Sequence, residues 1–598
     1  MHAAINEAAQ RKDTDTRRSQ VLPWIIDPLM SRTNMDVHMR GKQLICAKDE
    51  EFGHRLHGQH FGITLSTRRR LSLSSGFSIP NAIGRRFRGQ LWWLEEGYAT
   101  ARVLSDHFAR VVIIEPDYRI KRTATRVAQR GHPHFPMPMM ILICRALYSD
   151  FDEVAAKMGC KVHSPFRRWI VGTFWFCNWR TTTANPSLEY QRVELEKTLR
   201  KLAASYAGDS LEVIQGTVTR LHASPRPLSA SISAVSYKAS MKSSETVTIP
   251  CVFFADCSGA SAIASKLLPE AIVNYSEAGS TEAAMGLQWG PYTRHSYVPK
   301  VMARCFYVPV KDEKLKQQIA DLLPRNDPNW GNWNELRTLH FQSPGIDMDG
   351  SGGGPKEGIL IQKVLDNELL ISYSSLGDVT MPMNLAQLNL VVRDVHEELF
   401  KLNPSLKDIS LWVYALFDLL QESQVDDEIQ ILSASAKMYS SWYIDYLSAP
   451  TPNNFVAIGD SAMCVNPIFS QGMMKALQNA VMLNTTLHKH ITGFTTDTDA
   501  ALLPISRSYF ALANQVCLHM YIFNRMFDYG YPTTKPQEGE TLEYGARFRV
   551  YWKYLNRASQ KSTMVANVLE EALGGLRPGL DLFSPLVVGR VLWEWFQG

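Results

Sequence analysis

The chain has 598 residues, of which 45% are hydrophobic and 20% are charged. This is the composition of an ordinary globular protein with enough apolar material for a large core, and the length suggests roughly two to four domains. The formal net charge is only +5, from 63 basic and 58 acidic residues, so the composition does not argue for a nucleic-acid partner.

The nine cysteines include no pair at the two-residue spacing of metal and redox motifs, and their number is odd. This argues against a disulfide framework or a structural zinc site and predicts a reducing, cytoplasmic location. The first residues have no apolar core typical of a secretory signal, and no stretch of about 18 apolar residues predicts a membrane span. The last predicted helix, 586–596, carries Trp593, Trp595 and Phe596. We interpret it as a cap on its domain, with a peripheral contact to a membrane surface as the alternative.

Residues 1–84 are polar and irregular, so we expect an N-terminal extension without sustained secondary structure. After it, apolar residues spaced three and four apart predict a helix over 100–108. An apolar run over 111–114 follows and ends at Glu115. A helix that leads into a fully apolar strand is typical of a parallel sheet covered on both faces.

The elements after this unit continue the alternation of helices and strands. The sequence predicts an amphipathic helix over 189–204, strands over 211–214 and 218–221, a Ser-rich hairpin over 223–248 and a buried strand over 250–256. Residues 276–445 mix alternating strands with helices around 380–400, which predicts an α+β region. Residues 500–598 are mostly helical in pattern and rich in aromatic side chains.

Glu115 stands where a dinucleotide-binding unit needs an acid for the ribose hydroxyls. Gly97 lies 18 residues earlier, at the place of the third glycine of such a unit. The first two glycines are missing, because positions 92 and 94 hold a tryptophan and a leucine, and Glu95 and Glu96 follow. Bulky side chains would block a diphosphate, and two carboxylates would repel it at a helix start that otherwise attracts anions.

Two interpretations of this segment stay open. Either the chain binds a dinucleotide weakly or not at all, or the stretch before Gly97 is a mis-joined coding segment in which the first strand and its glycines are lost. Residues 85–91 are basic and make a poor apolar strand, whereas the chain from Gly97 onward keeps the expected register. We therefore favour the second interpretation.

A later segment has a more specific pattern. A strand predicted over 454–460 ends in Gly459 and Asp460, and a loop then leads through Gly472 into a helix predicted over 475–487. Asp460 can accept a hydrogen bond from a sugar hydroxyl at a strand end, where ligands bind. The proline and glycine of the loop let the backbone pass close to a flat ring, and the helix N-terminus offers N–H groups to negative charge on that ring.

Together these segments resemble the flavin monooxygenases related to p-hydroxybenzoate hydroxylase. The loop is most similar to the branch of FAD-dependent epoxidases and hydroxylases that acts on polyketides and terpenoids. The resemblance runs from about Gly97 to the C-terminus and implies an α/β fold. Its expected parts are a Rossmann-like FAD-binding domain of the glutathione-reductase type over 85–275 and 446–499, an inserted α+β substrate domain over 276–445, and a helical region over 500–598. The FAD-site residues that the resemblance implies are Gly97, Glu115, Arg126, Gln129, Arg192, Asp256, Gly259, Gly459, Asp460, Pro467, Gln471, Gly472 and Met473.

Several of these positions take a role from the resemblance alone. Arg126 and Gln129 resemble the Arg-x-x-Gln step that follows the ribose acid. Arg192 resembles the arginine that reaches the flavin phosphates or the ribityl chain, and Asp256 and Gly259 resemble the Asp-x-x-Gly step.

The resemblance also implies the reaction. NAD(P)H reduces FAD, O2 reacts with the reduced flavin, and one oxygen atom passes to an apolar small molecule by epoxidation or hydroxylation, in the biosynthesis of secondary metabolites. The protein supplies a dry pocket and orientation, so no side chain is named as a catalytic acid or base. His132 and His134, for which no third metal ligand is evident, are interpreted as part of a loop on the substrate side.

Three alternatives remain beside this function. A flavin-dependent reductase or dehydrogenase uses the same scaffold. A halogenase does so too, although Trp169, Trp175 and Trp179 lack its Trp-x-Trp-x-Ile-Pro arrangement and fit an aromatic core. The third alternative is a degenerate, non-catalytic homologue that binds an apolar ligand without FAD, for which the altered segment before Gly97 is the evidence.

Overall fold

The computed structural model describes most of the chain after the predicted extension. The described ranges are 88–91, 94–116, 128–134, 137–163, 168–171, 174–177, 187–223, 231–239, 245–271, 289–323, 325, 330–336, 338–343, 356–365, 367–377, 379–423, 428–434, 440–491 and 504–597. Within them a few side chains, that of Gln129 among them, are not described. The predicted extension 1–84 and Arg126 lie outside the described residues.

A parallel sheet lies at the centre of the first part of the fold. Its strands run in the order β19–β11–β1–β2–β7, and every neighbouring pair is parallel. They are β1 (Arg88–Leu91), β2 (Arg110–Glu115), β7 (Leu211–Gln215), β11 (Phe253–Asp256) and β19 (Phe455–Ala457). Residues 111–114 and 253–256 are buried, as expected for apolar runs covered on both faces. The mixed α/β character expected from the sequence is confirmed.

Strand β1 corrects one expectation. Residues 85–91 were expected to make a poor strand, yet β1 occupies the central position of the sheet between β11 and β2. Gln90 pairs with Phe254 on one side and with Val112 on the other. Strand pairing uses backbone groups that every residue except proline carries, so two apolar neighbours can hold a strand of poor composition in place.

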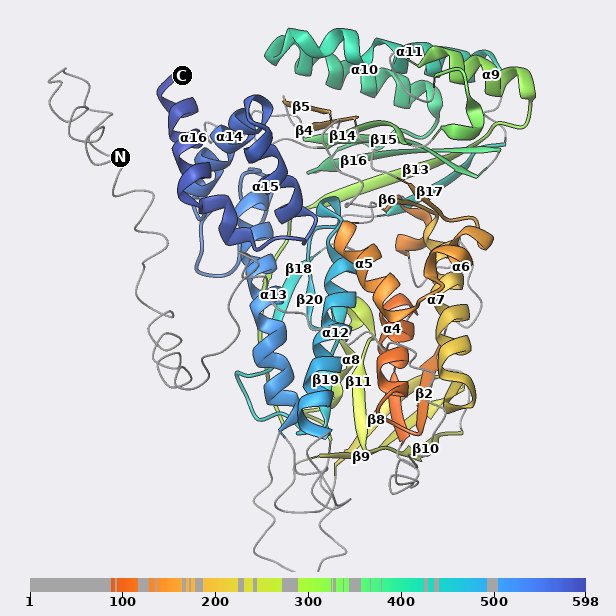
Figure 1. Ribbon diagram of the computed structural model, residues 1–598, viewed down its shortest axis with the longest axis vertical. Coiled ribbons are helices and arrows are strands. Elements are labelled where there is room, and N and C mark those ends of the chain that lie inside the picture. Colours follow the sequence, from red (N-terminus) through yellow and green to blue (C-terminus); the bar gives the residue numbers. More distant parts are fainter. Residues whose placement is uncertain are drawn as a thin grey trace, which may run out of the picture. The chain divides into compact units, whose positions relative to one another are not determined.

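The helices that share one hydrophobic core with the parallel sheet include α4 (Leu94–Ser105), α5 (Pro138–Leu147), α7 (Arg192–Ala207) and α12 (Gly472–Ile491). Helix α4 begins shortly after β1 ends and leads back into β2, so it starts earlier than the predicted range 100–108. Figure 1 shows α4 and α12 beside strands of this sheet. The shorter elements near it are η2 (Ala128–Gly131), α6 (Phe151–Lys157), β3 (Lys161–His163), β6 (Ser187–Glu189), η3 (Gly208–Ser210), η4 (Gly259–Ser261) and α8 (Ile263–Leu267).

Two three-stranded antiparallel sheets accompany the parallel one. The predicted Ser-rich hairpin belongs to a sheet of order β10–β9–β8, and the other sheet has the order β12–β18–β20. Their strands are β8 (Thr217–Ala223), β9 (Ile232–Lys238), β10 (Val247–Pro250), β12 (Thr293–Tyr297), β18 (Ser441–Asp445) and β20 (Met463–Cys464).

A seven-stranded mixed sheet forms the second large layer, in the order β17–β13–β16–β15–β14–β4–β5. Its strands are β4 (Arg168–Val171), β5 (Phe174–Cys177), β13 (Val301–Pro309), β14 (Thr338–Ser343), β15 (Glu357–Leu365), β16 (Glu368–Leu376) and β17 (Gln430–Ala434). Helices α9 (Glu313–Leu322), α10 (Leu385–Leu402) and α11 (Lys407–Glu422) pack on this sheet through a separate apolar core. The hairpin β4–β5 lies in the range 85–275 that the sequence analysis assigned to the FAD-binding domain, yet β4 pairs with β14.

The C-terminal part is helical, with α13 (Ile505–Asp528), α14 (Ala546–Lys561), α15 (Thr563–Leu573), η13 (Gly579–Phe583) and α16 (Pro585–Gln597). Helix α16 buries Val587 and Val591 against its neighbours and leaves Leu586, Trp593 and Phe596 exposed. A contact of this face with a membrane surface stays a prediction. Among the helices of the described ranges, none combines the length and the apolar character that a membrane span requires.

Candidate functional site

The carboxyl edge of the parallel sheet gathers polar residues that the sequence singled out. Glu115 is the last residue of β2, Asp256 is the last residue of β11, and Gly459 follows the end of β19. Because parallel strands end at the same edge, these positions lie along one side of the sheet, where ligands bind in such folds. The side chains of Glu115 and Asp256 are buried there.

Helix α12 holds the turn after β19 through two side chains. The strand predicted to run to Asp460 is shorter than expected, because Gly459–Ser461 form a 3-10 turn (η10). The N–H of Gly459 donates to Oδ1 of Asn479 at 3.1 Å, and Nζ of Lys475 donates to Oδ1 of Asp460 at 2.5 Å. Lys475 and Asn479 are four residues apart, so both meet the turn from the same face of the helix.

Lys475 is a functional candidate that the sequence analysis missed. Helix α12 begins at Gly472, not at the predicted position 475, so Lys475 lies inside the helix. The signal in the sequence is a single lysine within the apolar run 473–477. A charged residue on a buried helix face needs a partner. Here the partner is Asp460, in the turn that follows β19.

The surroundings of Lys475 keep its side chain positively charged. Its side chain has no exposure, and its ammonium group also donates to the backbone oxygen of Met463. Burial alone lowers the pKa of Lys475, but the carboxylates of Asp460 and Glu96 outweigh burial, so its pKa is raised. The ammonium group is therefore charged at neutral pH.

Glu96 lies in the first turn of α4 and reaches across to Gly459. A Cβ atom on Gly459 would collide with the carboxyl group of Glu96, so the glycine permits this close approach. Gly459 also has a φ of 65°, a left-handed conformation that glycine adopts without strain. The carboxylate of Glu96 thus occupies the space directly over the turn that follows β19.

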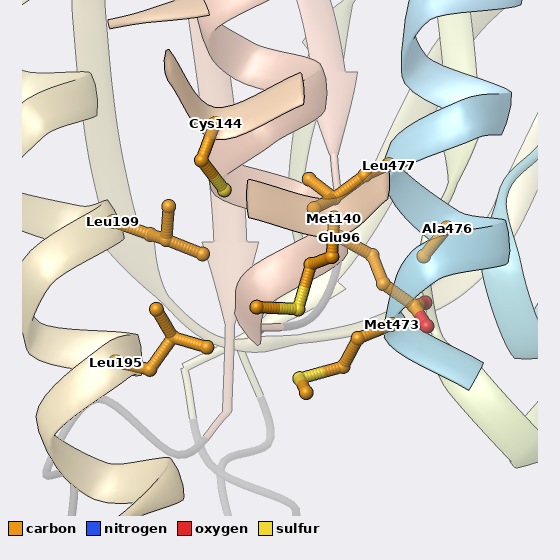
Figure 2. A pocket seen from close by; sticks show the side chains of 8 residues that line it. All are labelled: Glu96, Met140, Cys144, Leu195, Leu199, Met473, Ala476 and Leu477. Carbon is orange, nitrogen blue, oxygen red and sulfur yellow. The ribbon is translucent and has the colours of Figure 1, made fainter. Parts of the chain in front are cut away.

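Figure 2 shows Glu96 at one side of a small cavity, with its carboxyl group toward α12. The other residues that line the cavity are apolar side chains from α5, α7 and α12, namely Met140, Cys144, Leu195, Leu199, Met473, Ala476 and Leu477. The cavity leaves about 10 Å³ for the centre of a water molecule, so it can hold one water. In this conformation the cavity is too small for a flavin ring or an organic substrate.

Asp256 organises the loop that follows β11. Its Oδ1 accepts the N–H of Ser258 and its Oδ2 accepts the N–H of Ala264, both at 2.8 Å. Its backbone oxygen accepts the N–H of Ile458 at 2.9 Å, which ties β11 to the end of β19. Burial raises the pKa of Asp256 more than these hydrogen bonds lower it. Both carboxyl oxygens are therefore engaged within the protein, and Gly259 begins the next turn.

The loop before α12 presents an open helix end. Pro467 is exposed at the start of the turn η11 (Pro467–Phe469), and Oδ1 of Asn466 accepts the N–H of Ile468 at 3.0 Å. Gly472 is the first residue of α12, and a Cβ atom there would meet nothing within 4 Å. The space beside Gly472 at this helix end is therefore open, and the binding of a ring there stays a prediction.

Residues of helix α13 hold the same loop through hydrogen bonds. The sequence analysis did not predict these contacts. Nδ2 of Asn524 donates to Oε1 of Gln471 at 2.8 Å, and Nδ2 of Asn466 donates to Oδ1 of Asp528 at 2.7 Å. The hydroxyl of Tyr297 donates to Oδ2 of Asp528 at 2.8 Å. Burial raises the pKa of Asp528 to about 7, although both hydrogen bonds lower it.

Arg192 opens α7 and belongs to a buried ion cluster. Its Nε lies 3.5 Å from Oε1 of Glu196, and Nε of Arg130 lies 2.8 Å from Oε2 of the same carboxylate. Burial raises the pKa of Glu196 more than the two arginines lower it. Leu195 and Leu199 follow Arg192 by three and seven residues and line the cavity, so Arg192 lies on the helix face that approaches it.

The η2 segment lies beside this cluster. Gln129 lies in η2, and Arg126 is outside the described residues. Nδ1 of His132 lies 3.4 Å from Sγ of Cys305. Burial lowers the pKa of His132 to about 4 and raises that of Cys305 to about 12, which keeps both neutral and excludes an activated thiolate. Across the described ranges no three His, Cys, Asp or Glu side chains come together in a way that could hold a metal ion.

The comparisons with known proteins support the fold. No protein-family model and no curated protein matches the chain. A flavoprotein/dehydrogenase from Cytophaga hutchinsonii matches with a TM-score of 0.50 and 10% identity, over 86% of this chain and 100% of that chain. The flavin-dependent brominase Bmp2 (TM-score 0.48, 12% identity, 85% and 98% of the two chains) and the myxobacterial chondrochloren halogenase CndH (0.45, 13%, 84% and 92%) match with lower TM-scores. The chain therefore has the fold of a flavoprotein.

The residues at the carboxyl edge can be tested against FAD. The ammonium group of Lys475, the glycine turn at Gly459 and the start of α4 together favour an anion, as a diphosphate requires. The anion that stands there in the structure is the carboxylate of Glu96. The open helix end at Gly472 suits a ring that carries negative charge. The donor set therefore fits FAD, and Glu96 holds the space over Gly459 that a phosphate group would take.

Gly459→Ala is expected to destabilise the protein by about 2 kcal/mol. An alanine in a left-handed conformation costs about 1–2 kcal/mol, and its Cβ also displaces the carboxyl group of Glu96. Urea unfolding followed by tryptophan fluorescence measures the change. In a Glu96→Ala background the collision disappears and the backbone strain remains, so the cost of Gly459→Ala should shrink without vanishing. An equal cost in both backgrounds would show that Glu96 does not contact the turn.

Proposed function

We propose that the chain is an FAD-dependent oxidoreductase of the flavin monooxygenase type. Its reductant is NAD(P)H, and with O2 it epoxidises or hydroxylates an apolar small molecule in secondary metabolism. The observation that carries the proposal is the carboxyl edge of a parallel sheet in a flavoprotein fold. An acid ends β2, a glycine–aspartate turn follows β19, and an open helix end begins at Gly472.

Each part of FAD has a proposed partner among the residues of this chain. Glu115, at the end of β2, would hold the adenosine ribose. Lys475 and the N–H groups at the start of α4 would attract the diphosphate once the Glu96 side chain has moved away, and Asp460 would accept a ribityl hydroxyl. The helix end at Gly472 would stabilise negative charge on the ring. FAD, when bound, supplies electron transfer and oxygen activation.

Other residues of the predicted site support this arrangement without contacting the cofactor. Gln471 is held by α13, and Met473 contacts the hydroxyl of Tyr190 through its sulfur atom at 3.6 Å. Asp256 ties the loop after β11 to β19. Such contacts fix the backbone around a cofactor without touching it, which is how a protein orients a flavin and excludes water from it.

An absorption spectrum tests the proposal. After dialysis against excess FAD, the protein should show bound flavin that absorbs at about 450 nm. NADPH or NADH should bleach this absorbance, and O2 should restore it. Gly472→Val should lose this flavin, because the valine fills the open side of the helix end. Gly589→Val in α16 is the matched control, since a Cβ there also meets nothing within 4 Å and flavin should be retained. No bound flavin in the wild-type chain or in any Glu96 variant would overturn the proposal.

The second candidate is a non-catalytic homologue that binds an apolar ligand without FAD. The observation in its favour is the carboxylate of Glu96 over Gly459, which stands where a phosphate group would bind. The two candidates differ in one measurement. A wild-type protein that binds no flavin, while a Glu96 variant does, identifies a scaffold that keeps the site and has closed it.

A further inference from the structure

A carboxylate of this chain sits in a place that suits an external anion. Glu96 is in the first turn of α4, directly after the central strand β1, and its carboxyl group lies against Gly459 on the far side of β11. At a helix start the free N–H groups and the helix dipole stabilise negative charge. Gly459 carries no Cβ, so a bulky anion can approach its backbone. The site is thus built from two elements that are far apart in the sequence.

A buried cation completes this site. Lys475 has no exposure, lies 2.5 Å from the carboxylate of Asp460, and has a pKa raised by both Asp460 and Glu96 after burial has lowered it. A buried ammonium group needs negative charge nearby, and Asp460 supplies the one unit that balances it. Glu96 adds a second carboxylate whose charge also acts on Lys475. An external anion in place of Glu96 would keep that additional attraction.

We propose that Glu96 is an internal anion that competes with the diphosphate of a dinucleotide for the space over Gly459. The inference rests on the proposed function. In the conformation described here the carboxylate holds the site, and a dinucleotide binds only after the Glu96 side chain has swung away. The side chain is long and flexible at its end, so this movement needs no change in the backbone of α4.

The competition lowers the apparent affinity for the dinucleotide. Ligand binding must first displace Glu96 and move one carboxylate away from Lys475, and this cost is subtracted from the binding free energy. Ligands without a diphosphate do not meet this cost. The expected signature is therefore an effect of Glu96 on FAD, ADP and inorganic pyrophosphate, with no effect on riboflavin.

Titrations with two variants test the inference. Glu96→Gln keeps the size of the side chain and removes its charge, and Glu96→Ala removes the group. Quenching of flavin fluorescence should show FAD binding about tenfold tighter or more in both variants than in the wild type, within the usual range of such couplings. Inorganic pyrophosphate and ADP should raise the Tm of the variants more than that of the wild type. Riboflavin should bind all three proteins equally.

Asp106→Ala provides the matched control. Asp106 follows the same helix at its other end, is exposed, and pairs with Arg102. Its removal changes the net charge by the same amount as Glu96→Ala. FAD affinity should stay at the wild-type value, because Asp106 lies away from Gly459. Far-UV circular dichroism and an unchanged gel-filtration volume establish that each variant is folded.

The outcomes separate this inference from the proposed function. If pyrophosphate stabilises the Glu96 variants and FAD does not bind them, the anion site stands and the flavin function fails. If FAD binds the wild type as tightly as both variants, the internal competition is wrong and the flavin function stands. If Asp106→Ala tightens FAD binding as much as Glu96→Ala does, general charge explains the effect and the inference is overturned.

Discussion

Lys475→Met should lower the free energy of unfolding by about 3 kcal/mol, the largest loss expected for one substitution near the site. Lys475 is fully buried, and its partner Asp460 is mostly buried. Removal of one member of a buried ion pair typically costs about 3–5 kcal/mol, because the other charge stays behind unpaired. Here two carboxylates lose their cation at once, since the charge of Glu96 also acts on Lys475. Urea unfolding followed by tryptophan fluorescence measures the loss.

Two further variants show whether charge or packing causes this loss. Lys489→Met lies on the same helix but is exposed, so its stability should stay within about 0.5 kcal/mol of the wild type. Glu96→Gln and Asp460→Asn, added to Lys475→Met, remove the stranded charges and should restore most of the stability. A triple variant as unstable as Lys475→Met alone would assign the loss to packing.

Asp528→Asn is expected to make the protein less sensitive to pH. Burial raises the pKa of Asp528 to about 7, whereas in the unfolded chain the carboxyl group has a pKa of about 4. Between these values the folded state holds a proton that the unfolded state has released, so stability is full below about pH 4 and falls as pH rises toward 7. The slope is about 1.4 kcal/mol per pH unit for one such group. Asparagine at 528 has no proton to lose and removes this slope.

Thermal unfolding at several pH values checks this prediction. The Tm of Asp528→Asn minus that of the wild type should increase from pH 5 to pH 8, because only the wild type then buries a negative charge. Asp106→Asn, which changes an exposed carboxylate just after α4, serves as control and should show a small, flat difference. A difference that is the same at pH 5 and pH 8 for Asp528→Asn would mean that the group titrates normally. The same variant should leave the loop at Asn466 in place, since its amide oxygen can still accept from Nδ2 of Asn466.

Local patterns in the sequence were enough for the elements that form the sheet edge. The apolar run that ends at Glu115 is β2, and the buried strand that ends at Asp256 is β11. The glycine–aspartate step before a long helix also lies where a strand, a turn and a helix meet. These features depend on neighbours in the sequence, because burial on both faces of a strand and a helix start each leave a local signature.

The partners within the site could not be predicted in the same way. Glu96, Asp460 and Lys475 come from three separate elements, and which charge faces which depends on how those elements pack. Glu96 was noted as an obstacle to phosphate, but its contact with Gly459 depends on the left-handed turn there. The strand β1 was misjudged because its place is set by β11 and β2 and not by its own side chains.

The pairing of β4 with β14 has a consequence for how the chain reaches its fold. Residues 168–177 leave the ribosome long before 338–343, so the β4–β5 hairpin exists for some time without the strand that it joins. Contacts between segments so distant in the chain form slowly, and an unpaired strand edge can meanwhile pair with another molecule. A fragment ending near residue 275 would keep that edge exposed permanently. Such a fragment, which also lacks β19 and α12, is therefore expected to aggregate when it is produced alone, so cofactor titrations need the whole chain.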